Sequence, residues 1–299
     1  MKAGDEVAVE ATGNVRLFTQ ALKDRGCRVV VVNPHQFQVI SRSVKKTDEP
    51  DAQVLAEFLS KGLRPEVRMK DEGHARVASL AQTRDKRVKL RTSLKNKGNN
   101  LLAARGTLLR KESVASEKGL DEVLASPVSE LERMELEILV GEIRHLNESI
   151  KKLEEMLRKQ GPKLPGWENI TSIKGIGETG ATILLSTIGN IQDFADEGPL
   201  AAYFGIGIVP RVSNFNETER SGRITKRGCK LERTALVQCA LIAARYSPYL
   251  QTYYRRIAAT RGRGQAIIAL ARKFLTIIYR TLKNDWVFED FPSFKLVEV

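Results

Sequence analysis

Apolar runs and one amphipathic segment open the chain. Residues 6–10 (EVAVE) are short and apolar, residues 14–26 carry apolar side chains at helical spacing, and residues 27–33 contain four consecutive valines. A strand, a helix and a second strand predict a βαβ unit, and an unbroken apolar run is typical of a buried parallel strand. Two parallel strands need further cover, and no other strand is predicted soon after them. We therefore expect a partial α/β unit that lacks a strand upstream.

A further helix is predicted in the same unit. Apolar residues recur at helical spacing from Val54 to Leu59, Pro50 and acidic residues precede them, and Gly62 follows. Proline and acidic residues favour the first turn of a helix, and glycine favours its end. We assign residues 1–65 to this partial α/β domain.

Long helices are predicted in the middle of the chain. The spacing is helical from about residue 74 to residue 157, with breaks around Gly106 and near Pro127, so residues 72–160 are assigned to a coiled-coil region. Apolar positions in the second helix are separated by alternating steps of three and four, as in a coiled-coil seam. A dimeric coiled coil and a hairpin within one chain both explain this seam. Its members are Leu136, Leu139, Ile143, Leu146, Ile150, Leu153 and Leu157.

The last part of the chain is predicted to be mostly helical. Residues 161–170 are rich in glycine and proline and indicate a linker into a domain at residues 164–299. The fold class that follows is α/β plus α. Helices are expected at about residues 179–188, 197–204, 230–246 and 264–283.

The charge of the chain indicates its class of partner. The 299 residues contain 49 Lys and Arg against 36 Asp and Glu, a net charge of +13. Residues 201–299 hold 17 Lys and Arg and 7 Asp and Glu, so this third supplies +10 of the total. A strongly basic protein attracts polyanions, and nucleic acid is the first expectation.

Other classes of protein are not supported. The apolar stretches are far shorter than the roughly 18 residues of a membrane span, and the N-terminus lacks the apolar region of a secretory signal. Cys27, Cys229 and Cys239 are an odd number without CxxC spacing, and the histidines are scattered. We therefore expect no membrane crossing, no disulfide framework and no zinc site, and a cytoplasmic location.

One basic segment lies in the first long helix. A run of cations is usually a solvated helix face, but a second basic cluster in the chain favours contact with nucleic acid. The cations are Arg84, Lys86, Arg87, Lys89, Arg91, Lys95 and Lys97, against Asp85 alone.

A glycine-rich turn precedes an apolar helix. Lys174 lies beside Gly175, and Gly177 and Gly180 follow. Glycines let backbone N–H groups at a helix N-terminus approach a phosphate closely, as in a helix-hairpin-helix contact with DNA. A tight turn between two helices is the alternative explanation.

A second basic segment, residues 220–233, leads into a helix. Gly222 and Gly228 separate its cations, a pattern that suits contact with a phosphate backbone independent of base sequence. A solvated surface loop is the alternative. The cations are Arg220, Arg223, Lys226, Arg227, Lys230 and Arg233.

Three acids are candidate ligands of Mg²⁺. Glu10 ends the first strand, and Asp48 and Asp51 lie three residues apart on one helical face. Carboxylates at a strand end and a helix start can converge on Mg²⁺, and two such ions clamp the attacking and leaving oxygens of a phosphodiester. Asp48 and Asp51 also fit a helix-capping arrangement that needs no metal.

Six motifs in this order resemble the DEDD-type insertion-sequence transposases, the recombinases related to the Piv invertase. The resemblance spans nearly the whole chain. It implies an RNase H-like (RuvC-like) domain, a coiled coil and a C-terminal transposase domain with a helix-hairpin-helix-like motif. The motifs are EATGN at 10–14, VVVVNP at 29–34, KTDEPDAQVLA at 46–56, IKGIGETGA at 173–181, FGIGIVPR at 204–211 and GRITKRG at 222–228.

The resemblance also implies a chemistry. In such enzymes four acids bind Mg²⁺, and a serine of the C-terminal domain attacks DNA to form a covalent phosphoserine. Family members act as oligomers and use a structured guide RNA. Glu10 matches the second acid, and Asp48 and Asp51 match the third and fourth, which favours metal binding over capping.

Two departures from the family pattern lower the expected activity. The first acid belongs to an opening strand that this chain lacks, so we expect a truncated member. The expected serine position is Phe215, which has no nucleophilic oxygen, and Ser213 and Ser221 are two residues before it and six after it. We expect a nucleic-acid-binding recombinase with impaired strand transfer. The alternatives are a non-catalytic subunit that assembles with a full-length relative, and a degenerate fragment.

Overall fold

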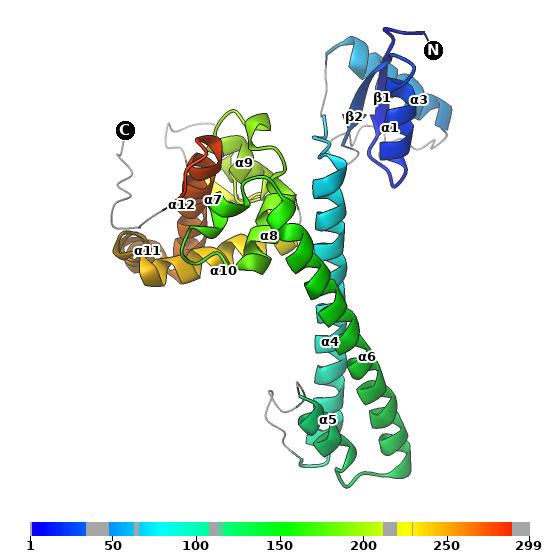
Figure 1. Cartoon of the computed structure of the whole chain (residues 1–299), viewed down its shortest axis with the longest axis vertical. Coiled ribbons are helices and arrows are strands. Elements are labelled where there is room, and N and C mark those ends of the chain that lie inside the picture. The colour runs from blue at the N-terminus through cyan, green and yellow to red at the C-terminus, as the bar shows by residue number, and fades with distance from the viewer. Residues whose placement is uncertain are drawn as a thin grey trace. The chain divides into compact units, whose positions relative to one another are not determined.

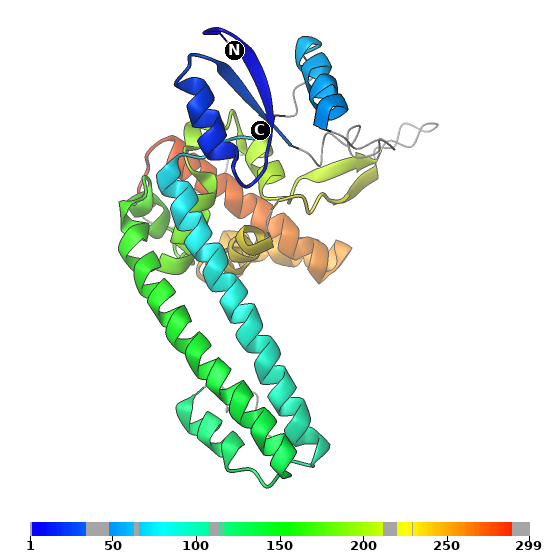
Figure 2. The same cartoon turned by 90° about the vertical axis from the view of Figure 1, so that its right-hand side faces the viewer.

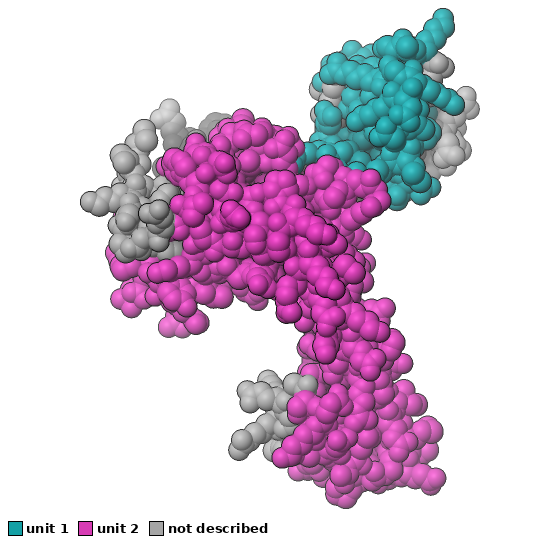
Figure 3. All heavy atoms as spheres, in the orientation of Figure 1, with its two compact units in different colours: residues 1–70 teal, residues 71–299 magenta. Residues whose placement is uncertain are grey.

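Two compact units make up the chain. The computed structural model describes residues 2–33, 48–62, 66–107, 114, 116–211, 220–228 and 230–288. The units are residues 1–70 and residues 71–299 (Figure 3). None of the helices in the described ranges combines the length and the hydropathy of a membrane-spanning segment.

The first unit contains the predicted βαβ arrangement. Strand β1 (Glu6–Glu10) pairs in parallel with β2 (Arg28–Val32), in a register that places Glu10 opposite Val32, and α1 (Val15–Lys23) connects them. Val30, Val31 and Val32 are buried, as expected for a parallel strand inside a domain.

Strand β2 has more cover than the sequence indicated. Val32 forms an antiparallel bridge with Glu66, and the Val67 amide donates to the Val31 carbonyl at 2.7 Å. Helix α3 (Asp48–Ser60) packs its apolar side chains against this sheet. The cover that the sequence did not identify therefore comes from residues 66–67 and α3, both of which follow β2 in the chain. The packed helix side chains are Val54, Leu55, Phe58 and Leu59.

An antiparallel helical hairpin begins the second unit. Helix α4 (Glu72–Ala104) runs beside α6 (Glu130–Gln160), with α5 (Glu117–Leu124) near the turn (Figures 1 and 2). Helix α6 starts with a capping box, in which Ser129 and Glu132 satisfy each other's backbone N–H groups.

The predicted seam of α6 lies inside this hairpin. Leu136 and Ile143 pack in one cluster with Leu102 of α4 and Leu120 of α5. Leu139 and Leu153 are only half-buried, and Val140 takes a buried position instead. Of the two arrangements that the seam allowed, the structure has the hairpin within one chain. The remaining buried members of the seam are Leu146, Ile150 and Leu157.

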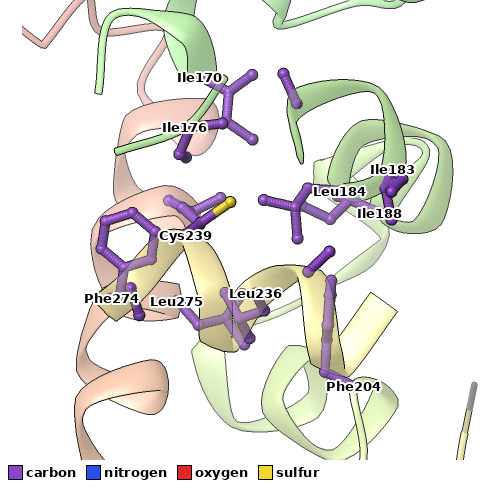
Figure 4. Packing of buried hydrophobic residues seen from close by; sticks show 14 of the residues in the cluster. Ile170, Ile176, Ile183, Leu184, Ile188, Phe204, Leu236, Cys239, Phe274 and Leu275 are labelled. Carbon is purple, nitrogen blue, oxygen red and sulfur yellow. The ribbon is translucent and has the colours of Figure 1, made fainter. Parts of the chain in front are cut away.

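Helices α7–α12 form the C-terminal core together with the base of the hairpin. Side chains from α8, α10 and α12 meet in this core, as Figure 4 shows for Leu184, Leu236 and Phe274. The antiparallel strands β3 (Ile208–Arg211) and β4 (Arg220–Ile224) precede α10. The helices are α7 (Trp167–Thr171), α8 (Glu178–Ile188), α9 (Glu197–Tyr203), α10 (Lys230–Tyr246), α11 (Pro248–Arg261) and α12 (Arg263–Lys283).

The segment interpreted as a linker is part of this core. Residues 161–170 contain a 3₁₀ turn at Gly161–Lys163 and the start of α7. Leu164 and Ile170 are buried, and a Cβ on Gly161 would lie 2.7 Å from the Trp167 ring. The linker interpretation was therefore wrong, because the segment packs tightly against its neighbours.

Candidate nucleic-acid interface and metal-binding acids

Glu10 lies at the carboxyl end of β1 with its side chain exposed. The Ala11 amide still pairs with β2, donating to the Val32 carbonyl at 3.0 Å, and the chain then turns, with the Thr12 amide donating to the Glu10 carbonyl at 2.9 Å. The Glu10 carboxylate has no hydrogen bond or ion pair within the described residues. It is therefore available to an outside cation.

Asp48 and Asp51 occupy the first turn of α3. Their side chains lie outside the described part of the structure, so their distance from Glu10 is not defined. The described side chains include no cluster of three acidic, histidine or cysteine residues able to hold a metal. The chemistry of the three acids still suits Mg²⁺, which prefers carboxylate oxygens.

Most cations of the basic segment on α4 have partners in the hairpin. The Arg84 guanidinium contacts Glu154 at 2.6 Å, Arg91 donates to Asn147 at 2.7 Å, and Lys97 contacts Glu135 at 3.1 Å. These contacts join α4 to α6.

The other cations of this segment differ in their surroundings. Lys89 pairs with Asp85 on the same helix, while burial, followed by the charge of Arg91, lowers the pKa of Lys95. Lys86 and Arg87 have no ion pair among the described residues. The unpaired charge available for a phosphate is therefore concentrated at these two positions.

The glycines of the 173–180 turn have different reasons for being glycine. Gly175 has a φ of +107°, and a Cβ there would lie 2.5 Å from the backbone nitrogen of Ala243 on α10. A Cβ on Gly180 would lie 2.8 Å from the Cys239 sulfur. These two glycines allow close packing of the turn and α8 against α10, which supports the structural alternative for them.

Gly177 is the residue of this turn with open space around it. It caps α8 in an extended conformation, and no atom lies within 4 Å of a Cβ built on it. Lys174 is exposed, whereas Ile173 and Ile176 are buried. Glu178, in the first turn of α8, contacts Arg158 at 3.5 Å. The predicted phosphate contact therefore has an open helix start and one exposed cation, beside one acid.

The second basic segment forms a firmly held turn. The Thr225 amide donates to the Gly207 carbonyl at 3.0 Å, and the Lys226 amide donates to the Gly205 carbonyl at 3.1 Å. A Cβ on Gly205 would overlap the Arg227 carbonyl oxygen, so this approach requires glycine.

Two exposed cations lie at this turn. Lys226 has a φ of +52°, which is uncommon for a residue with a side chain, and both Lys226 and Arg227 are exposed. Lys230 is exposed at the start of α10. Arg220 and Arg223 lie on β4, with side chains outside the described part of the structure. The sequence analysis did not identify the role of Gly205. That role depends on the close approach of its backbone to residue 227, which only the structure shows.

Two family models match the chain. A model described as "Transposase IS116/IS110/IS902 family" matches residues 167–255, and a DEDD transposase model of the IS110 type matches residues 3–107. The second match begins at residue 3 and gives no support to the expected N-terminal truncation.

Curated relatives are similar over almost the whole chain. The transposase for insertion sequence element IS1111A of Coxiella burnetii is 28% identical over 93% of this chain and 78% of its own length. A probable family 20 transposase of Pseudomonas aeruginosa is 27% identical over 93% and 84%, and a pilin gene-inverting protein of Moraxella bovis is 26% identical over 94% and 81%. Together with the two model matches, these similarities show that the chain belongs to the IS116/IS110/IS902 family of transposases.

Proposed function

We propose that this protein is a DNA recombinase that binds DNA through its C-terminal domain and acts in the transposition of an insertion sequence. The observation that carries the proposal is the exposed Lys226–Arg227 turn, held by backbone contacts to residues 205–207. A fixed turn holds its charges ready for a phosphate, so less conformational entropy is lost on binding. The turn 174–177 ahead of α8, as a helix-hairpin-helix-like contact, is a second point of attachment.

We propose that Glu10, Asp48 and Asp51 hold Mg²⁺ in the first unit, which would then be an RNase H-like domain. When bound, Mg²⁺ stabilises charge on the oxygens of a phosphodiester. The exposed and unpaired carboxylate of Glu10 supports this role. The protein's own contribution is the position of Glu10 at the carboxyl end of β1, just before the chain turns at residue 12.

Strand transfer is the step in which this chain departs from its family. Phe215 occupies the expected serine position and lies outside the described residues, as does the nearby Ser213. We propose that the covalent step is impaired for this reason. The same residue favours a second candidate function, a non-catalytic nucleic-acid-binding protein derived from a transposase.

The proposed partners follow from the same assignment. DNA is the substrate, a structured guide RNA directs the choice of site, and the chain works in the cytoplasm as an oligomer. The oligomer is composed of identical copies or includes a related transposase.

The recombinase assignment is tested with a supercoiled plasmid, DNA carrying the ends of the element, and Mg²⁺. We expect little covalent protein–DNA product from the natural chain and an increase for Phe215→Ser, because serine restores a nucleophilic oxygen. Phe215→Ala is the matched control and should stay inactive. Abundant product from the natural chain would contradict the impairment. DNA binding without product from the natural chain or Phe215→Ser would favour the non-catalytic alternative.

The role of Glu10 is tested in the Phe215→Ser background. Glu10→Gln removes one charge and should lower product formation about 100-fold or more, because metal stabilisation of the transition state is worth several kcal/mol. The matched control is Glu57→Gln in the last turns of α3, because Glu57 forms an ion pair with the neighbouring Lys61 and with no other described residue. Equal activity of Glu10→Gln and the control would remove Glu10 from the metal site.

DNA binding itself is tested by fluorescence anisotropy with duplexes of different sequence at several salt concentrations. Lys226→Ala and Arg227→Ala should weaken binding to every duplex about equally, and each should reduce the slope of log affinity against log salt by about 1. Lys118→Ala, at an exposed position on α5, is the control. An affinity that does not depend on salt would contradict the proposal.

A further inference from the structure

A long stretch of the C-terminal domain contains cations and no acid. Between Glu232 and Asp285, residues 233–284 include ten Lys and Arg and no Asp or Glu. This stretch comprises most of α10, all of α11 and all of α12. None of its ten cations forms an ion pair within the described residues, in contrast to the paired cations of α4. The charge is therefore available to an outside polyanion.

Tyrosines and cations are combined on α11 and α12. Tyr249 and Tyr253 lie one turn apart on α11, and the Lys273 ammonium of α12 lies 5.8 and 5.9 Å from their ring centroids. The Arg256 guanidinium lies 5.6 Å from the Tyr253 centroid. We call these four residues the tyrosine–cation cluster.

The two tyrosines of this cluster differ in their role. Tyr249 packs partly against the hydrophobic core, whereas Tyr253 is half-buried and is not part of that core. The Tyr253 ring therefore contacts two cations without being part of the hydrophobic core. Cation–π contacts at exposed sites are worth only about 0.5–1 kcal/mol each, so a phosphate can compete for these cations.

More cations extend the surface around the cluster. Arg255, Arg261 and Arg263 are exposed on α11 and at the start of α12. Tyr246, 58% exposed at the end of α10, adds a further aromatic side chain nearby in the sequence. Aromatic rings among closely spaced cations are typical of proteins that bind single strands, because bases stack on the rings while the cations contact phosphates.

We propose that the tyrosine–cation cluster binds a single strand of nucleic acid, with unpaired bases stacked on Tyr253 and phosphates held by Arg256 and Lys273. This site is composed of different residues from the Lys226–Arg227 turn, which is proposed for the duplex backbone. The inference rests on the proposed function only in that the protein encounters nucleic acid. A duplex offers this cluster only its backbone, because its bases are already stacked in the helix.

The test measures the affinity of the full chain for labelled oligonucleotides of about 20 residues, a length above the site size of typical single-strand modules. The probes are oligo-dT, oligo-rU and a duplex, so the first two distinguish DNA from RNA. Tyr253→Ala should weaken binding to a single strand about fivefold or more, the loss expected for one stacked base, and change duplex binding less than about twofold. Tyr253→Phe keeps the ring and should bind as the natural chain does.

Two further variants separate binding from folding. Lys273→Gln and Arg256→Gln should weaken single-strand binding and reduce its salt dependence, and Lys118→Ala should not. Thermal unfolding of each variant identifies any loss of structure. If Tyr253→Ala or Lys273→Gln is unfolded, the single-strand affinity of Arg256→Gln is compared with that of Tyr253→Phe, which keeps the ring.

The outcomes distinguish this inference from the proposed function. Single-strand affinity that is unchanged in Tyr253→Ala, or a loss that is equal for duplex and single strand, would overturn the inference while the recombinase assignment stands. Selective loss of single-strand binding in a protein that carries out no strand transfer in any form would support the inference and leave the recombinase assignment without support.

Discussion

Single glycines show how closely the C-terminal helices pack. Gly175 combines a left-handed φ with a backbone approach to Ala243, whereas Gly177, two residues later, has an ordinary φ and free space. A side chain at the first position would meet a main-chain atom, which cannot move without shifting α10. Within one short turn, Gly175 is therefore required for packing, whereas Gly177 lies at the surface.

We predict that Gly175→Ala lowers the free energy of unfolding by about 3 kcal/mol, the sum of backbone strain and overpacking. Gly177→Ala is the matched control and should cost less than about 1 kcal/mol. Urea unfolding followed by circular dichroism measures both. Equal effects of the two substitutions would show that the turn does not pack against α10 as described.

The N-terminus of α6 shows how an element is fixed by its first turn. The Arg105 guanidinium donates to Glu132 at 2.7 Å, and the amide and hydroxyl of Ser129 donate to the same carboxylate. The hydrogen bond from Arg105, followed by those from Ser129, lowers the pKa of the Glu132 carboxyl to about 2 from its ordinary 4.5. The same residues join the end of α4 to the start of α6.

We predict an acid-dependent contribution of Glu132 to stability. Because its pKa is lower in the folded chain, the contribution is complete above a pH of about 4.5 and is lost as the pH falls toward about 2. Glu132→Gln should therefore lower the melting temperature at pH 7, and this difference should shrink as the pH decreases. Glu142→Gln, an exposed α6 acid, should have little effect at any pH. A difference independent of pH would contradict the assignment.

The hairpin depends on the buried contact between its helices. Leu102 of α4 is fully buried in the cluster that contains Leu136 and Ile143. We predict that Leu102→Ala lowers the free energy of unfolding by about 3 kcal/mol, because it leaves a cavity in that cluster. Leu90→Ala, on the same helix but 50% exposed, should cost less than about 1 kcal/mol. Chemical unfolding of both variants checks the comparison.

The elements that sequence patterns identified are those with strong periodicity. The βαβ opening, the helix after residue 47 and the two long helices all have regular apolar spacing, and the structure has them. Helix α11 was not expected; Leu250 is its one fully buried residue, and its half-buried positions include three tyrosines. The partners of Arg84 and Arg91 could not be predicted from the sequence, because they lie 70 and 56 residues away along the chain. Charge runs alone did not distinguish paired cations from free ones.

At the scale of the whole molecule, the hairpin and the C-terminal helices form one folding unit. Val77 and Ala81 of α4 and Leu157 of α6 belong to the same hydrophobic core as Leu236 and Phe274. A cut between the hairpin and the C-terminal domain therefore removes part of that core.

We predict that residues 71–299 fold alone, and that residues 161–299 are markedly less stable because they lack Val77, Ala81 and Leu157. Each lost aliphatic contact in a core costs on the order of 1 kcal/mol or more. Circular dichroism and calorimetry of both fragments measure the difference, with the full chain as reference. Equal melting temperatures of the two fragments would show that the hairpin contributes nothing to the core.

The shared core at the base of the hairpin has a mechanical consequence. Helix α4 has 33 residues, so at 1.5 Å per residue it measures about 50 Å from end to end. Two helices joined along their length resist bending more than one, and both are embedded at the same end. The arm is thus a stiff spacer, and anything attached near α5 is kept roughly that far from the domain that carries the Lys226–Arg227 turn.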